Sequence, residues 1–142
     1  MYQELALQIA QKAHVGQVDK AGKDYILHPI TVSSYMDTDT EKAIAYLHDV
    51  LEDTNVTVDE LRTIFSNEIV DAVITLTHRK DESYFEYIQR VSKSNLAKKV
   101  KVADLIHNLD ITRIKEPTKS DYERLEKYKK AILFQYNRKS VM

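Results

Sequence analysis

Only two glycines and two prolines occur in the 142 residues of this chain. The tight turns of β-rich folds depend on these residues, because glycine adopts positive φ and proline fixes φ at the start of a turn. A sandwich or barrel of many short strands would need many more of them. The scarcity of both residues therefore favours helices joined by short connections.

Apolar residues recur at helical spacing along most of the chain, and we expect about eight helices. Capping boxes are predicted at 38–41, 57–60 and 120–123, and a serine cap at Ser66. The expected helices span approximately 2–14, 29–35, 40–54, 57–65, 66–76, 84–91, 96–109 and 120–136. These segments predict an all-α, single compact domain over residues 1–142.

The net charge of −1 conceals a strong asymmetry between the two parts of the chain. Residues 1–78 hold 5 basic and 13 acidic side chains, whereas residues 79–142 hold 16 basic and 9 acidic ones. An acidic part suits a bound cation, and a basic part suits an anionic ligand. A charge asymmetry of this kind requires an explanation in the function of the chain.

Several classes of protein are excluded by what the sequence lacks. Without cysteine there is no disulfide framework and no thiolate metal site. No apolar run approaches the roughly 18 residues needed to cross a membrane, and the start of the chain does not resemble a signal peptide. The basic part contains no recognisable nucleic-acid-binding motif. We expect a cytoplasmic protein with no membrane or nucleic-acid partner; the sequence does not predict its oligomeric state.

The expected helix 40–54 places polar groups next to its apolar residues. His48, Asp49, Glu52 and Asp53 follow an apolar stretch and would share neighbouring turns of a helix. Three carboxylates this close repel one another unless a cation lies among them, and imidazole with carboxylates suits a first-row divalent metal. The alternative is that this segment is simply the solvated end of a helix.

Two other segments supply further polar groups in apolar surroundings. Asp104 interrupts the apolar run of helix 96–109, and a buried carboxylate without a partner is costly. Asn108 lies one turn later on the same face. His28 stands before Pro29 at an element boundary, where its side chain can point into a cleft or serve only as a structural residue.

Together, three motifs resemble the HD-type hydrolase domain of the RelA/SpoT stringent-response family. They are HxGQ…G…YILHP at 14–29, HDVLEDT at 48–54 and VKVADLIHNL at 100–109. The resemblance extends from about residue 5 to residue 131 and is greatest to the short, stand-alone alarmone hydrolases. It implies an all-helical domain that binds one Mn²⁺ and removes the 3′-pyrophosphate of ppGpp or pppGpp, which yields GDP or GTP and pyrophosphate.

The resemblance also implies roles for particular residues. The implied metal ligands are His28, His48, Asp49 and Asp104. Glu52 and Asp53 correspond to the acidic pair that positions and activates the attacking water. The residues implied to contact the substrate are Lys20, Lys101, Asn108, Arg124 and Tyr128.

Three positions depart from the family pattern. Asp19 and Asp24 stand where an arginine and a proline are common, and Leu105 replaces a common basic residue. Two alternatives therefore stay open beside alarmone hydrolysis. The chain would act on another phosphorylated nucleotide, or it would be a non-catalytic, metal-bound module that senses nucleotides.

Overall fold

The structure, a computed structural model, describes the backbone of residues 1–141 and the side chains of residues 1–135. Its described residues form helices and no strand, apart from one isolated bridge between Val18 and Asp24. The all-α prediction is confirmed. The elements are α1 (Tyr2–Ala13), α2 (Leu27–Ser34), α3 (Asp39–Leu47), α4 (Val50–Asp53), α5 (Val58–Arg62), α6 (Asn67–Thr75), α7 (Tyr84–Val91), α8 (Asn95–Asn108), the 3₁₀ helix η1 (Ile111–Arg113) and α9 (Lys119–Val141).

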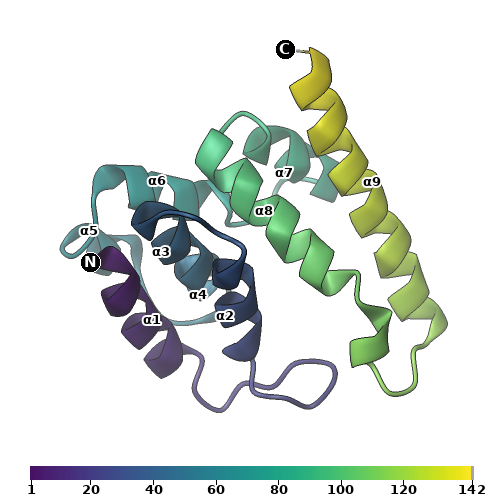
Figure 1. Cartoon of the computed structure of the whole chain (residues 1–142), viewed down its shortest axis with the longest axis horizontal. Helices are drawn as coiled ribbons and strands as arrows, with labels where there is room; N and C mark the ends of the chain where they lie inside the picture. The colour runs from purple at the N-terminus through teal and green to yellow at the C-terminus, as the bar shows by residue number, and fades with distance from the viewer. Residues whose placement is uncertain (142) are drawn as a thin grey trace.

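Helix α3 is the centre of the bundle and packs against α1, α2, α6 and α8 (Figure 1). Its Ile44 and Leu47 are fully buried, as are Val70 of α6 and Val100 of α8. Each such side chain contributes about 1.5–3 kcal/mol through burial. The core therefore fixes α2, α3 and α8 relative to one another, and these are the helices that carry or border the metal-ligand candidates.

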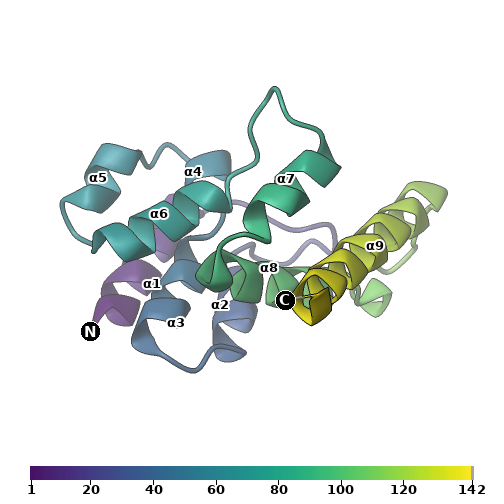
Figure 2. The same ribbon diagram turned by 90° about the horizontal axis from the view of Figure 1, so that it is seen from above.

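Helix α9 lies along the other side of α8, where it also contacts α7 and η1 (Figures 1 and 2). The loop between α1 and α2 extends toward η1 at the same edge of the molecule (Figure 1). A pocket opens between this loop and the start of α9. None of the helices in the described part of the chain is both long and apolar enough to cross a membrane.

The predicted helix 40–54 is wrong, because the structure breaks it into α3 and α4 at His48 and Asp49. The backbone N–H of His48 donates to the oxygen of Ala45, three residues back, and the His48 Nδ1 lies 2.7 Å from the same oxygen. This tight turn ends α3. His48 is therefore not one helical turn from Glu52, although both remain near the same site.

Three of the four predicted helix caps are present in the structure. Thr38 forms a complete capping box with Glu41, and the side chains of Thr57 and Ser66 accept bonds from backbone N–H groups.

The box predicted at 120–123 is misplaced, because α9 starts at Lys119. The Thr118 N–H donates to Asp121 Oδ2 (2.8 Å), and the Asp121 N–H donates to Thr118 Oγ1 (3.4 Å). Thr118 thus takes the capping position, since an acidic side chain follows it at the required spacing. The helix also continues to Val141, beyond its predicted end near Tyr136.

Candidate metal centre

Two histidines and an aspartate from three segments meet in the interior. His28 comes from α2, His48 from the turn between α3 and α4, and Asp104 from α8, and one ligand atom from each lies within 4.8 Å of the other two. His28 Nε2 is 2.7 Å and His48 Nε2 is 3.5 Å from Asp104 Oδ1. All three residues are buried. Two imidazoles and a carboxylate form a donor set that suits a divalent transition metal.

The orientation of His48 indicates that a positive charge belongs in this cluster. Its Nδ1 donates to the Ala45 carbonyl, so the neutral ring directs the lone pair of Nε2 inward. That nitrogen lies 3.0 Å from Asp49 Oδ2, yet within the described part of the chain it has no hydrogen-bond partner. Burial lowers the pKa of His48, but Asp49 and Asp104 outweigh burial and raise this pKa well above its usual value. The lone pair of Nε2 and the carboxylate oxygens of Asp49 and Asp104 repel one another. A proton or a metal cation between them would relieve this repulsion, and the donor set fits a metal.

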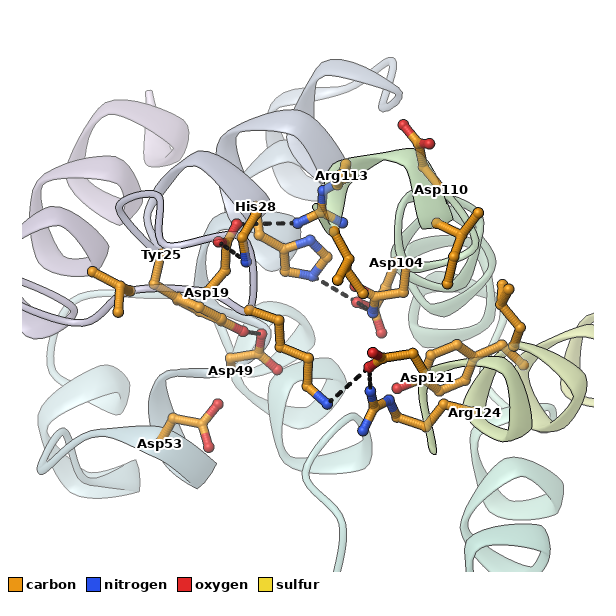
Figure 3. A pocket seen from close by; sticks show the side chains of 18 of the residues that line it. Asp19, Tyr25, His28, Asp49, Asp53, Asp104, Asp110, Arg113, Asp121 and Arg124 are labelled. Carbon is orange, nitrogen blue, oxygen red and sulfur yellow. Dashed lines mark hydrogen bonds and ion pairs between the residues drawn. The ribbon is translucent and has the colours of Figure 1, made fainter. Parts of the chain in front are cut away.

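Asp49 lies at the edge of this cluster. Its Oδ2 faces His48 and also accepts a hydrogen bond from the hydroxyl of Tyr25 (Figure 3). Burial raises the pKa of Asp49, but His48 outweighs this effect and lowers the pKa to about 2. Asp49 is therefore an ionised carboxylate next to the three buried candidate ligands. Sequence reasoning missed Tyr25, whose role is visible only once the α1–α2 loop folds against Asp49.

Asp104 has polar partners on its own helix. Lys101 Nζ lies 2.8 Å from Asp104 Oδ2, and Asn108 Nδ2 donates to Oδ1 at 3.1 Å. Burial raises the pKa of Asp104, but Lys101, His28 and His48 hold it well below its usual range. Lys101 and Asn108 are predicted as substrate contacts, and in the structure both are bonded to the candidate ligand Asp104.

His107 lies against His28, on the side away from Asp104. It stacks on His28 with ring centroids 4.9 Å apart, and the two Nδ1 atoms are 2.7 Å from each other. This contact orients the His28 ring, which is the usual function of groups behind a ligating histidine.

A pocket of about 510 Å³ opens above the cluster (Figure 3). It brings together all of the predicted site residues except His48, which is buried. These lining residues are Lys20, His28, Asp49, Glu52, Asp53, Lys101, Asp104, Asn108, Arg124 and Tyr128. Residues from both the acidic and the basic parts of the chain thus share one pocket.

The acidic pair lies on α4 at the wall of this pocket. Glu52 Oε1 accepts the backbone N–H of His78 at 2.9 Å, which orients its carboxylate. Burial raises the pKa of Asp53, and the negative charges of Asp49 and Glu52 raise it further. The raised pKa of Asp53 reflects its burial and the negative charge gathered at this wall of the pocket.

Two ion pairs cross the pocket from the α1–α2 loop (Figure 3). Asp19 pairs with Arg113 of η1 at 3.2 Å, and Lys20 lies 3.8 Å from Asp121 of α9. Asp121 also pairs with Arg124. Sequence reasoning missed Arg113, since no periodic pattern marks its segment, and it treated Asp121 only as part of a helix cap.

The comparisons with known proteins agree with this fold. A family model described as HD domain matches residues 6–132. The chain therefore belongs to the HD domain family.

Within that family the chain is similar to proteins named guanosine-3′,5′-bis(diphosphate) 3′-pyrophosphohydrolase. It is 38% identical over 120 residues to the guanosine-3′,5′-bis(diphosphate) 3′-pyrophosphohydrolase of Borreliella burgdorferi, with 73% of this chain and 18% of that protein covered. The protein of the same name from Haemophilus influenzae is 34% identical over 117 residues, with 71% of this chain and 17% of that protein covered. The chain thus spans less than a fifth of the length of these curated relatives.

A solved structure, described as a metazoan ortholog of SpoT that hydrolyses ppGpp, matches with a TM-score of 0.80 and 25% identity. The match covers 94% of this chain and 84% of that one. The resemblance inferred from the three motifs is confirmed.

Proposed function

We propose that residues 1–142 act as one metal-dependent phosphohydrolase domain, which removes the 3′-pyrophosphate of ppGpp or pppGpp. The products would be pyrophosphate and GDP or GTP. The observation that carries this proposal is the inward-facing Nε2 of His48, which meets carboxylate oxygens without a hydrogen bond at the base of a pocket. The names of the similar proteins supply the substrate. A cytoplasmic location follows from that substrate, because guanine nucleotides are made and used there.

His28, His48 and Asp104, with Asp49 at the edge, would hold one divalent cation, which we propose to be Mn²⁺. When bound, such a cation polarises phosphoryl oxygens and lowers the pKa of water. Lys101, Asn108 and His107 keep the ligands in place through their bonds to Asp104 and His28.

Hydrolysis requires one proton to leave the attacking water and one to reach the 3′ oxygen as its bond to phosphorus breaks. Glu52 is the proposed acceptor of the proton from water and would return it to the 3′ oxygen, because the His78 amide fixes its carboxylate at the pocket wall. Asp53, one residue further along α4, would position the water. Lys20, Arg124 and Tyr128 lie across the same pocket and would contact the nucleotide.

The test is incubation of the purified full chain with Mn²⁺ and ppGpp, with separation of the products by ion-exchange chromatography. We expect GDP and pyrophosphate in equal amounts. Asp104→Asn should abolish turnover, whereas Asp59→Asn, on α5 and outside the pocket, should not change it. A fully metal-loaded wild-type protein that leaves ppGpp intact would refute the proposed substrate.

Asp19 supports a second candidate function, the hydrolysis of a different phosphorylated nucleotide. It replaces a common arginine of the family, and its carboxylate is held by Arg113 and by the N–H groups of Ala21 and Lys23. The pocket wall at this position is therefore a fixed ion pair instead of an arginine. Parallel assays with ppGpp, ppApp and nucleoside 3′,5′-bisphosphates would show which substrate has the highest kcat/KM.

A further inference from the structure

The lysines and arginines of the pocket already have carboxylate partners. The lining includes four such cations and seven carboxylates. Within the described residues, Lys101 pairs with Asp104, Arg113 with Asp19, and both Lys20 and Arg124 with Asp121. An anionic ligand that binds a cation here must therefore compete with one of these carboxylates.

Two of these arrangements are held by additional bonds. The Lys101–Asp104 pair is almost inaccessible, with side-chain exposures of 12% and 7%, and Asp104 belongs to the candidate metal cluster. In the other pair, Asp19 Oδ1 accepts from two backbone N–H groups, and Arg113 donates to the carbonyl of His107 at 3.0 Å. A ligand that displaced Asp104 would disturb the candidate metal cluster, and Arg113 is held in place by the His107 carbonyl as well as by Asp19.

Asp121 is different because a single carboxylate oxygen faces two cations, whereas Asp104 and Asp19 each pair with one lysine or arginine. Oδ2 accepts bonds from the N–H and hydroxyl of Thr118 and so caps α9. Oδ1 faces the two cations, Arg124 on its own helix and Lys20 from the α1–α2 loop (Figure 3). The Lys20 contact is long, at 3.8 Å, and this lysine side chain is 57% exposed.

We propose that Asp121 Oδ1 is an internal substitute for a phosphate oxygen of the ligand. A phosphate group would bind Lys20 and Arg124 by displacing Oδ1, while Oδ2 keeps its bonds to Thr118. The carboxylate carries one negative charge, so it competes less well with a diphosphate than with a monophosphate. Asp121 would thereby lower the affinity for all phosphates and select those with the greater charge. This inference rests on the proposed function only in requiring a phosphorylated nucleotide as ligand.

The experiment is isothermal titration calorimetry of the full chain with GDP, and with guanosine as the ligand without phosphate, in one Mn²⁺-containing buffer. Asp121→Asn retains an oxygen for the Thr118 amide and removes the competing charge. We expect GDP to bind about three- to fivefold more tightly to this variant, in line with the strength of a partly exposed ion pair. Guanosine binding should not change.

Glu123→Gln is the matched control, because it removes the same charge from α9 at a side chain that is 67% exposed and outside the pocket. Its GDP affinity should equal that of the wild type. Arg124→Gln leaves the Thr118–Asp121 cap intact, so it tests the same subsite even if Asp121→Asn folds poorly. It should weaken GDP binding at least about threefold.

An unchanged GDP affinity in Asp121→Asn or in Arg124→Gln would overturn the inference, as would an equal gain for guanosine or no GDP binding to any variant. Failure of the proposed function is a separate result. Tighter GDP binding by Asp121→Asn in a chain that does not hydrolyse ppGpp would support the subsite and refute the alarmone substrate.

Discussion

The carbonyl oxygen of Ala45 determines how His48 is used. It accepts the backbone N–H of His48, which ends α3, and also the Nδ1 proton of the imidazole. The same contact therefore breaks the helix and turns Nε2 toward Asp49 and Asp104. Such a coupling of backbone and side chain is local, but the hydrophobic pattern of the sequence contains no sign of it.

Tyr25 should increase metal affinity through its hydroxyl, which donates to Asp49. We predict that Tyr25→Phe lowers the affinity for Mn²⁺ about 10- to 100-fold, the usual effect of removing a group that orients a ligand. Titration calorimetry of the metal-free protein measures this. Tyr35→Phe is the control, because Tyr35 is 52% exposed on the surface. Equal Mn²⁺ affinities for the wild type and Tyr25→Phe would show that the hydroxyl has no such role.

Glu52 should affect turnover without affecting metal binding. Glu52→Gln keeps an oxygen for the His78 amide but cannot accept a proton, so kcat for ppGpp should fall about 100-fold or more. Mn²⁺ affinity should stay within about twofold of the wild-type value. Glu68→Gln, on exposed α6 surface, serves as the control. A kcat within twofold of the wild-type value would assign proton transfer to another group.

At the scale of elements, sequence reasoning succeeded where the signal is local. Apolar spacing and capping residues identified the helices, and the Thr38 box is present as predicted. It failed at 48–49 because Leu47, Val50 and Leu51 continue an apolar pattern through the break. It misplaced the start of α9 because Thr118 and Ser120 are both followed by an acidic residue three positions later, and only Thr118 caps the helix.

The connection between α6 and α7 should be sensitive to acid. Arg90 of α7 lies 2.6 Å from Glu82 and also donates to the carbonyls of Thr75 and Thr77. The hydrogen bond from Arg90 lowers the pKa of Glu82 from 4.5 to about 2. Because the folded pKa is the lower one, ionised Glu82 stabilises the fold above about pH 5, and this contribution is lost as the pH falls toward 2.

We predict that Glu82→Gln lowers the free energy of unfolding by about 1 kcal/mol at pH 7. The difference from the wild type should shrink steadily between about pH 5 and pH 2. Urea denaturation across this pH range measures the difference in free energy of unfolding, and Glu68→Gln serves as the control. A difference that does not vary with pH would mean that the Glu82 charge contributes no stability.

At the scale of the molecule, the two oppositely charged parts of the sequence meet across one pocket. His28, Asp49 and Glu52 come from the acidic part, and Lys101 and Arg124 come from the basic part. The residue types and motifs of the sequence could predict which groups lie together in and below this pocket. It could not predict the ion pairs that link the α1–α2 loop to η1 and α9, because those pairs exist only after residues about 100 positions apart are brought together by the fold.

Metal binding should stabilise the whole domain, because its ligands come from three separate segments. At a free Mn²⁺ concentration 100 times the Kd, the gain is about 2.7 kcal/mol. This corresponds to a rise in Tm of about 5–10 °C for a domain of this size. Calorimetric melting in EDTA and in Mn²⁺ measures the shift. The Asp104→Asn variant should show little of this rise in Tm. An equal rise in that variant would mean that the stabilising ion binds elsewhere.

The most direct test of the metal centre is a crystal structure of the Mn²⁺-loaded protein, with an anomalous difference map recorded at a wavelength where manganese scatters anomalously. We predict one strong peak within coordination distance of His28 Nε2, His48 Nε2 and a carboxylate oxygen of Asp104, with Asp49 beside it. No peak at this position, or a peak held by other residues, would contradict the assignment of this cluster as the metal centre.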